Sequence, residues 1–427
     1  MICRSMLLCA IVLNGCANLG GESARAQNVE AAAGAVVLAE ADKLRSVGAT
    51  ILKEQPSLGL AAAWVSNAQM EGLANKSKNC GPYKFLAKSA ADSWPVIDRA
   101  FDVLLKNRDL NLSAAARTKS AGADTNCGNP NPDIVAVLAS MSGQGVWDDA
   151  SAFSEPYESR LHTLSDPNAQ VRDLIDRLRA IAGAPGLQIV IEPLGPGPNG
   201  PGWGTQQLSV RARIIGATRP AEYVVVGAHL DSVSDSAKAP GANDNASGAA
   251  VVLAAYRALL SQRAPPARTV DFIWYGAEEV APGRSVGLIG SEFLAKKYKW
   301  EDRYDVVGVL NFDMTMGPGA ENGAIAIEPD YTNFQLRKYM SDLNCAYVGA
   351  KVVDYRCGYP CSDHASWDAQ KFAAAHITET AKYDAAHTAA DRMDGLNAEQ
   401  GLLFAKLAAA FVLDLSNKTW RPEVARD

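Results

Sequence analysis

Several classes of protein are argued against by what this 427-residue sequence lacks. It has no run rich in Lys or Arg and its formal net charge is −6, so we expect no nucleic-acid partner. No apolar stretch of membrane-spanning length lies in the body of the chain. There is no fixed-period repeat, no low-complexity tract, and no Walker-type or G-x-G-x-x-G loop between a strand and a helix. The remaining composition, 48% hydrophobic and 21% charged, is typical of a globular protein of more than one domain.

Residues 1–26 have the pattern of an export signal, because Arg4 precedes a short apolar run at 6–13. Two processing routes are open. The string L-N-G-C ending at Cys16 resembles a bacterial lipoprotein signal, and A-R-A ending at Ala26 is an A-x-A-type cleavage site. Asn14 is unusual in a lipoprotein signal and favours cleavage near Ala26. Either route predicts a periplasmic or secreted protein, with membrane attachment only through a lipid on Cys16.

Five of the eight cysteines lie beyond this signal, at Cys80, Cys127, Cys345, Cys357 and Cys361. Disulfides are expected in an oxidising compartment. Cys357 and Cys361, with Gly358 and Pro360 between them, are candidates for a tight bridge. Cys80 and Cys127 are candidates for a second bridge, which leaves Cys345 as a free thiol. A structural zinc site needs four ligands, and no second cysteine pair lies near Cys357 and Cys361.

Residues 27–155 are predicted to form a mainly helical accessory domain or pro-domain. Val29–Glu54 is rich in alanine, the apolar residues of Ala90–Lys106 recur at helical spacing, and Pro132–Met141 is a further candidate helix. This region contains no catalytic motif, and the sequence assigns it no role.

From residue 156 to the C-terminus, predicted strands alternate with predicted helices. This order indicates an α/β domain with a mixed central sheet flanked by helices on both faces. The expected strands are 187–191, 207–215, 223–226, 269–274, 306–311, 324–327, 347–353 and 374–378, and the expected helices are 167–182, 249–260, 289–298, 333–343 and 398–415.

The residues of chemical interest begin where the Val224–Val226 strand is expected to end, at Gly227. His229 and Asp231 follow, and Asp244 lies just before the next helix. Ligands bind at such strand ends in open α/β sheets. An imidazole can bind a metal while a nearby carboxylate orients it, and Asp244 is a natural second ligand. Taken alone, the acidic residue before a helix is equally well explained as an N-cap.

Three further sites carry similar residues. Glu278 and Glu279 follow a strand, Asp313 ends another, and His387 lies in a loop with Asp391 four residues on. Taken alone, each of these sites could be an ordinary surface residue whose side chain is exposed to solvent. Together, two imidazoles and three carboxylates would suit two zinc ions, with the remaining glutamate free to accept a proton.

The sequence resembles the secreted M28-type zinc aminopeptidases, the group of the bacterial leucyl aminopeptidases. The matching strings are GAHLDS at 227–232, GANDNASG at 241–248, AEE at 277–279, FDMT at 312–315, CGYPCSDHASW at 357–367 and HT at 387–388. They occur in the family's order and cover roughly residues 160–416. The N-terminal third lies outside the resemblance.

The resemblance implies the zinc exopeptidase fold, two Zn²⁺ per chain and peptide substrates with a free N-terminus. It implies that Asp244 bridges the two ions, and that Glu278 acts as general base and acid. The remaining roles that it implies are His229 and Asp313 at one ion, Glu279 and His387 at the other, Asp231 orienting His229, and Tyr359 holding the oxyanion.

The segment around His376 departs from the family. In the similar aminopeptidases it lines an apolar side-chain pocket, for which Met314, His376 and Thr378 are the candidates here, yet this sequence reads H-I-T-E at 376–379. That departure argues against a simple preference for leucine. The residue after Asp391 is arginine, where the family usually has threonine. We interpret His364 as a support residue, and a satisfied core histidine is the simpler interpretation of His376.

Alternative functions on the same fold are a metallo-carboxypeptidase and a glutaminyl cyclase. A third alternative is a non-catalytic relative that keeps the fold. The complete set of ligand candidates argues against the cyclase and the non-catalytic relative, as does the retained Glu278 against the latter. The sequence makes no prediction of the oligomeric state.

Overall fold

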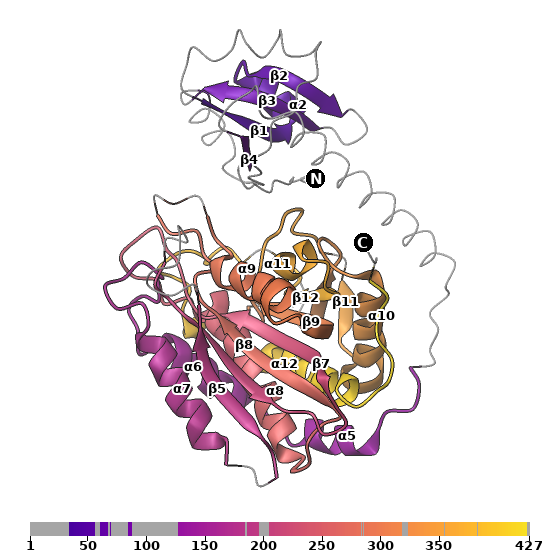
Figure 1. Cartoon of the computed structure of the whole chain (residues 1–427). Coiled ribbons are helices and arrows are strands. Elements are labelled where there is room, and N and C mark those ends of the chain that lie inside the picture. Colours follow the sequence, from indigo (N-terminus) through magenta and orange to yellow (C-terminus); the bar gives the residue numbers. More distant parts are fainter. Residues whose placement is uncertain are drawn as a thin grey trace. The chain divides into compact units, whose positions relative to one another are not determined.

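The computed structural model describes residues 34–55, 60–66, 69, 84–87 and 127–424, apart from 184–185, 196–204, 283, 285, 318–322, 354 and 382. The chain divides into two compact units (Figure 1). The first comprises residues 1–124 together with residues 357–361, and the second comprises residues 125–356 and 362–427. Within the described ranges, no helix is both long and apolar enough to cross a membrane.

The described part of the first unit is an antiparallel sheet with one short helix, α2 (Ala41–Ser46). The strands are β1 (Gly34–Glu40), β2 (Thr50–Gln55), β3 (Leu60–Ser66) and β4 (Lys84–Ala87), in the order β2-β3-β1-β4. The prediction that Val29–Glu54 is helical is therefore wrong for its described residues, except in α2. Alanine favours a helix locally, but pairing of β1 along the whole of β3 overrides that preference. The helix predicted at Ala90–Lys106 lies outside the described residues.

The second unit is built around an eight-stranded mixed sheet, in the order β11-β10-β12-β9-β7-β8-β6-β5. Its central strands β12, β9, β7 and β8 run parallel to one another. Strands β5 and β6 pair antiparallel with their neighbours, whereas β10 pairs antiparallel with β12 and parallel with β11. The strands are β5 (Ile189–Leu194), β6 (Ser209–Ile214), β7 (Arg219–His229), β8 (Arg268–Tyr275), β9 (Asp305–Asp313), β10 (Ala324–Glu328), β11 (Lys351–Val353) and β12 (Ala374–Thr378).

Helices cover both faces of this sheet, as the alternation of strands and helices predicts (Figure 1). One face packs into the main core with α5 (Pro132–Ala139), α6 (Gly143–Ser154), α7 (Ala169–Ile181), α8 (Gly248–Ser261), α10 (Phe334–Leu343) and α12 (Ala398–Leu415). The other face packs against α9 (Ile289–Lys296), the following turn η2 (Lys297–Glu301) and α11 (His364–Ala369), which contribute Leu294, Tyr298 and Trp367. The predicted fold class of this unit is confirmed.

Strand β7 continues to His229 instead of ending at Gly227. Gly227 is needed for packing, because a Cβ at this position would lie 2.5 Å from the ring of Tyr275 on the neighbouring strand. The glycine lets β7 and β8 stay paired up to His229 and Tyr275. His229 therefore belongs to the last residue pair of a central ladder, at the end where both strands are buried.

Two other expectations differ from the structure. The strand expected at 347–353 is shortened to β11, because residues Asn344–Val348 form a π-helical turn, η3, which continues from α10. The domain boundary expected at residue 155 falls near residue 124 instead, because α5 and α6 pack into the main core of the second unit. Their apolar faces are buried against α8 and α12, so the sheet would lose part of its cover without them.

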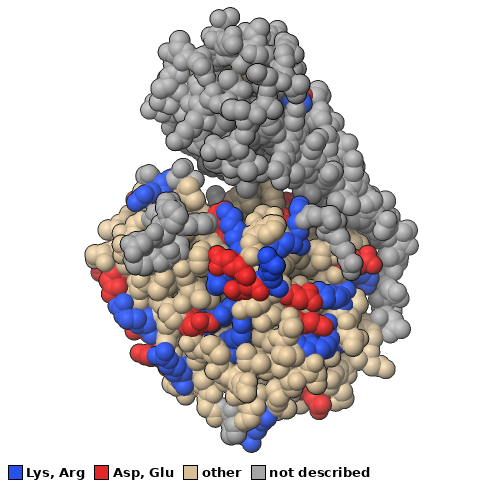
Figure 2. Space-filling model, viewed as in Figure 1, with Lys and Arg blue, Asp and Glu red and all other residues tan. Residues whose placement is uncertain are grey.

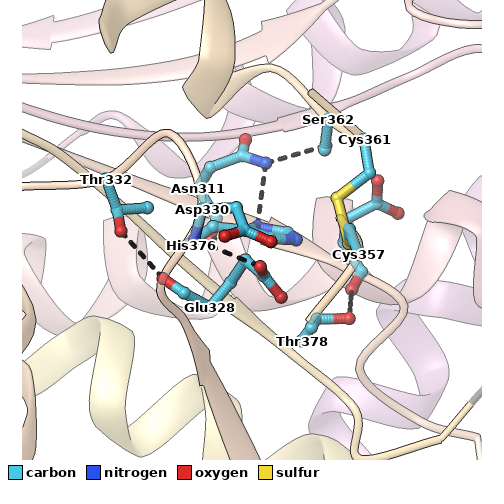
Figure 3. The surroundings of a disulfide bond; sticks show 10 residues. Asn311, Glu328, Asp330, Thr332, Cys357, Cys361, Ser362, His376 and Thr378 are labelled. Atoms are coloured by element: carbon cyan, nitrogen blue, oxygen red, sulfur yellow. Dashed lines mark hydrogen bonds between the residues drawn. A yellow bond between two sulfur atoms is a disulfide. The ribbon is translucent and has the colours of Figure 1, made fainter. Parts of the chain in front are cut away.

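Two disulfides join described residues. Cys357 and Cys361 form a disulfide that closes a short loop, as predicted (Figure 3). Cys127 pairs with Cys345, so the prediction that Cys345 is a free thiol is wrong. This bridge fastens the chain just before α5 to η3, where Asn131 N also donates a hydrogen bond to Tyr347 Oη at 3.0 Å. Cys80 lies outside the described residues.

Candidate metal centre and active site

The ends of three adjacent parallel strands place the candidate residues together. His229 is the last residue of β7, Asp313 is the last residue of β9, and Glu278 and Glu279 follow the end of β8. Asp244 lies in η1 (Ala242–Ser247), the irregular turn that leads into α8. Because the carboxyl ends of parallel strands meet at one edge of a sheet, residues far apart in sequence converge there.

Asp244 faces both imidazoles, one with each carboxylate oxygen. Its Oδ1 lies 3.2 Å from Nε2 of His229, and its Oδ2 lies 3.0 Å from Nε2 of His387. A second carboxylate completes each side. Asp313 Oδ1 is 3.4 Å from His229 Nε2, and Glu279 Oε2 is 3.2 Å from His387 Nε2. The five predicted ligands therefore form two groups, which we call half-sites: His229 with Asp313, and His387 with Glu279. Asp244 belongs to both half-sites.

These distances and donors fit a metal ion. Ligand atoms about 2.0–2.1 Å from a tetrahedral zinc ion lie roughly 3.3–3.4 Å from one another, close to the separations between these oxygens and nitrogens. His229, Asp244 and Glu279 offer ligand atoms that all lie within 4.8 Å of one another. Buried atoms of His229 (Nε2), Glu279 (Oε1) and Asp313 (Oδ1) have no hydrogen-bond partner. Buried polar atoms without a hydrogen-bond partner are expected where an ion binds.

The charges of the site also favour a cation. Burial raises the pKa of Glu278 well above its usual range and raises the pKa of Glu279 to about 7. Hydrogen bonds to Asp244 and Glu279 raise the pKa of His387 to about 12. Burial would raise the pKa of Asp244, but the two imidazoles that lie close to its carboxylate outweigh burial and lower that pKa. The site thus contains four carboxylates but only two imidazoles. Added positive charge would stabilise the carboxylates in their ionised form.

Asp231 supports this cluster from a fully buried position. Its carboxylate accepts hydrogen bonds from the backbone N–H groups of Glu278 and Glu279, at 3.0 and 3.1 Å. Its backbone oxygen lies 3.2 Å from Nδ1 of His229, and its Oδ1 lies 3.6 Å from the same nitrogen. Asp231 therefore contacts His229 as the sequence predicted, and also fixes the turn that carries the two glutamates.

Other supporting residues were not identified from the sequence. Asn243 accepts hydrogen bonds from Met316 N and Gly317 N, both at 3.0 Å, and its Nδ2 donates to the buried carboxylate of Glu379. Burial raises the pKa of Glu379 to about 8. Asn245 Nδ2 donates to the carbonyl of Phe312 at 2.9 Å. Both asparagines were visible in the string GANDNASG, but only the fold shows which strand ends they join.

A buried arginine holds the same turn from another direction. Arg160 donates from Nε to Leu230 O at 3.0 Å, from Nη2 to Gly241 O at 3.0 Å, and from Nη1 to Pro240 O. It thereby ties the end of β7 to the start of η1. No sequence signal marks Arg160, because the carbonyls it contacts lie at least 70 positions away.

The remaining predicted site residues lie outside the ligand cluster. Met314 directly follows Asp313 and is partly exposed, and Thr378 Oγ1 donates to Asp313 O at 2.7 Å. His376 is buried and stacks on His364 with ring centroids 4.4 Å apart. Burial lowers the pKa of His376 to about 4, so the ring is neutral. Tyr359 lies in the Cys357–Cys361 loop with an exposed side chain, and its role at an oxyanion stays a prediction.

The fold and the site together define a sheet-edge histidine–carboxylate centre of the kind that binds metal ions for hydrolysis. The crystal structure of the Legionella pneumophila LapA aminopeptidase has the same fold, with a TM-score of 0.64 and 24% identity over 91% of this chain and 100% of that chain. The model for peptidase family M28 matches residues 209–412.

Curated relatives extend the match. A protein named "Probable leucine aminopeptidase" from Arthroderma benhamiae is 30% identical over 312 residues, which cover 70% of this chain and 80% of that protein. A protein of the same name from Arthroderma otae is 37% identical over 226 residues, 49% of this chain and 57% of that protein. The chain thus spans little more than half the length of the latter relative. The chain belongs to peptidase family M28.

Proposed function

We propose that this protein is an exported di-zinc aminopeptidase that hydrolyses the N-terminal peptide bond of peptides. One observation carries the proposal: Asp244 presents one oxygen to each of two imidazoles, and each imidazole has a further carboxylate of its own. A carboxylate shared in this way suits two ions side by side. The family match and the aminopeptidase names of the relatives support the choice of reaction.

The residues divide into ligands and a proton carrier. His229, Asp313 and Asp244 Oδ1 would hold one zinc ion, and His387, Glu279 and Asp244 Oδ2 would hold the other. Bound zinc supplies Lewis acidity, which polarises a scissile carbonyl and lowers the pKa of water. Glu278 is adjacent in sequence to a ligand, and burial raises its pKa well above the usual range. It is therefore suited to accept a proton from the attacking water and to pass it to the leaving amine.

The carboxylates also explain why a free N-terminus is expected. An α-ammonium group brought to this centre would meet acidic side chains at close range, whereas an acylated nitrogen would lose that attraction. The proposal for export depends on residues 1–26, whose pattern fits a signal with cleavage near Ala26 or a lipid on Cys16.

A panel of aminoacyl chromogenic amides tests the reaction, with each substrate supplied in a free and an N-acetylated form. The protein is assayed as purified, after chelation, and after return of zinc. We expect turnover only of the free-amine substrates, loss on chelation and recovery with zinc. Turnover of the acetylated substrates, or full activity without metal, would contradict the proposal. An N-terminal glutaminyl peptide in the same panel separates hydrolysis from cyclisation.

Glu278→Gln tests the proton carrier separately from the ligands. Removal of a general base typically lowers the rate by about 10²–10⁴-fold. We expect a fall of kcat in this range while the zinc content, measured by elemental analysis, stays that of the wild type. A variant that keeps full activity would remove Glu278 from the mechanism.

A further inference from the structure

The loop that carries His387 is held together by its own hydrogen bonds. Thr388 Oγ1 donates to Ala385 O at 2.7 Å and accepts from Ala390 N at 3.1 Å, and Asp391 N donates to Thr388 O at 3.2 Å. The backbone at His387 has a φ of 61°, and the imidazole is 59% exposed. This ligand therefore depends on how the loop is fastened to the sheet edge.

Asp391 fastens the loop to η1. Its Oδ1 accepts a hydrogen bond from Asn243 N at 2.8 Å, its Oδ2 accepts one from Asp244 N at 2.9 Å, and its backbone oxygen accepts one from Ala242 N at 3.2 Å. Asp391 is only 1% exposed. A further hydrogen bond, from Asp235 N to His387 O at 3.2 Å, fastens the other end of the loop.

The backbone of η1 needs such an acceptor. Asp244 has φ and ψ of −110° and 89°, and Asn245 has −134° and 42°, so this turn departs from helical geometry. Buried N–H groups in a turn that is not helical lack the acceptors that a helix would supply and must find others. A carboxylate that accepts hydrogen bonds from two successive N–H groups fixes the direction of the peptide between them. That peptide leads directly to the side chain of Asp244.

We propose that Asp391 is a positioning residue, which fixes the shared ligand Asp244 and the loop of His387 relative to each other. This inference rests on the two-zinc centre proposed above. The zinc ion held by His387, Glu279 and Asp244 Oδ2 depends on both parts that Asp391 joins. The ion held by His229 and Asp313 depends on Asp391 only through Asp244. Loss of the Asp391 carboxylate therefore lowers the affinity for the first of these ions more than the affinity for the second.

The test is zinc affinity in Asp391→Asn, measured by competition with a chelator of known affinity. Asparagine keeps the shape but turns one acceptor into a donor that faces a backbone N–H. We expect a 10–100-fold weaker affinity for one zinc ion, as found for groups that support metal ligands, and a change below about threefold for the other. The kcat should fall at limiting zinc and recover at high zinc, with KM unchanged.

Two further variants separate position and charge from general effects. Asp391→Glu keeps the charge but displaces the carboxylate, so it should lower the affinity for the same zinc ion, the one assigned to His387 and Glu279. Asp394→Asn removes an exposed carboxylate three residues further on and should bind both ions as the wild type does. Urea unfolding of the chelated proteins checks that the effect on zinc is not an effect on folding.

The outcomes separate this inference from the proposed function. Two zinc ions bound by Asp391→Asn with wild-type affinities would overturn the inference and leave the di-zinc proposal standing. A wild-type protein that binds no zinc would overturn both. If the Asp391 variants do not fold, hydrogen exchange of the chelated wild type decides. Slow exchange at the amides of Asn243 and Asp244 supports the inference, and exchange as fast as that of an exposed loop overturns it.

Discussion

The two half-sites of the candidate metal centre are built in different ways. His229 and Asp313 end two neighbouring central strands, and the imidazole of His229 is 1% exposed. His387 comes from a loop between β12 and α12, and its imidazole is 59% exposed. The first half-site is fixed by the register of a buried ladder, whereas the second depends on side-chain hydrogen bonds that fasten a surface loop.

This difference predicts that the two half-sites respond differently to substitutions, both in the stability of the fold and in the affinity for metal. A ligand at the end of a buried strand cannot move without disturbing the sheet, so its half-site is rigid before any ion arrives. A loop ligand can move at little cost, and its position must be set by particular contacts. We therefore expect the strand half-site to hold its ion more tightly, and the loop half-site to respond more strongly to changes in the surrounding residues.

The largest effect is expected for Asp244→Asn, because Asp244 is the ligand that the two half-sites share. The amide loses the charge that offsets both ions and replaces one ligand oxygen with a poor ligand. Activity should fall by at least about 10³-fold, which is the scale of lost electrostatic stabilisation in an active site. Elemental analysis after gel filtration should find fewer than two zinc ions. A variant that retains two zinc ions would show that the half-sites are independent.

A smaller effect distinguishes His229→Gln from His387→Gln. In the chelated protein, removing the buried imidazole of His229 leaves the buried carboxylate of Asp313 without the imidazole that faces it, which should lower the free energy of unfolding by about 1–3 kcal/mol. Removing the imidazole of His387, which is 59% exposed, should cost less than about 1 kcal/mol, because solvent screens an ion pair that has an exposed partner. Urea unfolding with chelator present measures both. Equal losses would contradict the contrast between strand and loop.

The smallest effect concerns Glu379, which supports the turn that both half-sites share. Burial raises the pKa of Glu379 to about 8, above its ordinary value of 4.5. The folded state therefore holds this proton more tightly than the unfolded state. This contribution to stability is complete below about pH 4.5 and is lost as the pH rises towards 8.

The Tm of the chelated protein should accordingly fall between pH 5 and pH 8, and Glu379→Gln should make that fall smaller by a few degrees. Glu158→Gln, at an exposed position, is the matched control and should leave the pH dependence unchanged. The same slope in wild type and Glu379→Gln would show that Glu379 is already ionised in the fold at low pH.

Much of the second unit was predictable because its strands are apolar runs bounded by polar residues. Strand β12 and helix α12 occur at the predicted bounds, and β8 and β9 extend one or two residues beyond them. His229, Glu279 and Asp313 lie at or near the ends of such runs, whereas Asp244 precedes an apolar helix and His387 lies in a loop. The order of the strings therefore placed the ligands at one sheet edge before any distance was known.

The errors arose where long-range pairing decides the structure. The alanine-rich segment before Glu54 contains strands because β3 pairs with it, and sequence periodicity did not reveal that partner. Cys345 was expected to be free because its partner, Cys127, lies 218 residues away. Asp391 was noted only for its spacing from His387, since nothing local shows that its carboxylate accepts hydrogen bonds from Asn243 and Asp244.

The sequence by itself determined the fold class of the second unit, the five candidate ligands and the tight Cys357–Cys361 bridge. These depend on residue type and local pattern. Only the tertiary structure decided that one oxygen of Asp244 faces each imidazole, that one half-site is buried and the other exposed, and that Arg160, Asn243 and Asp391 hold the turn between them. The physical reason is that these hydrogen bonds join segments up to about 150 residues apart, and their partners are set by chain folding.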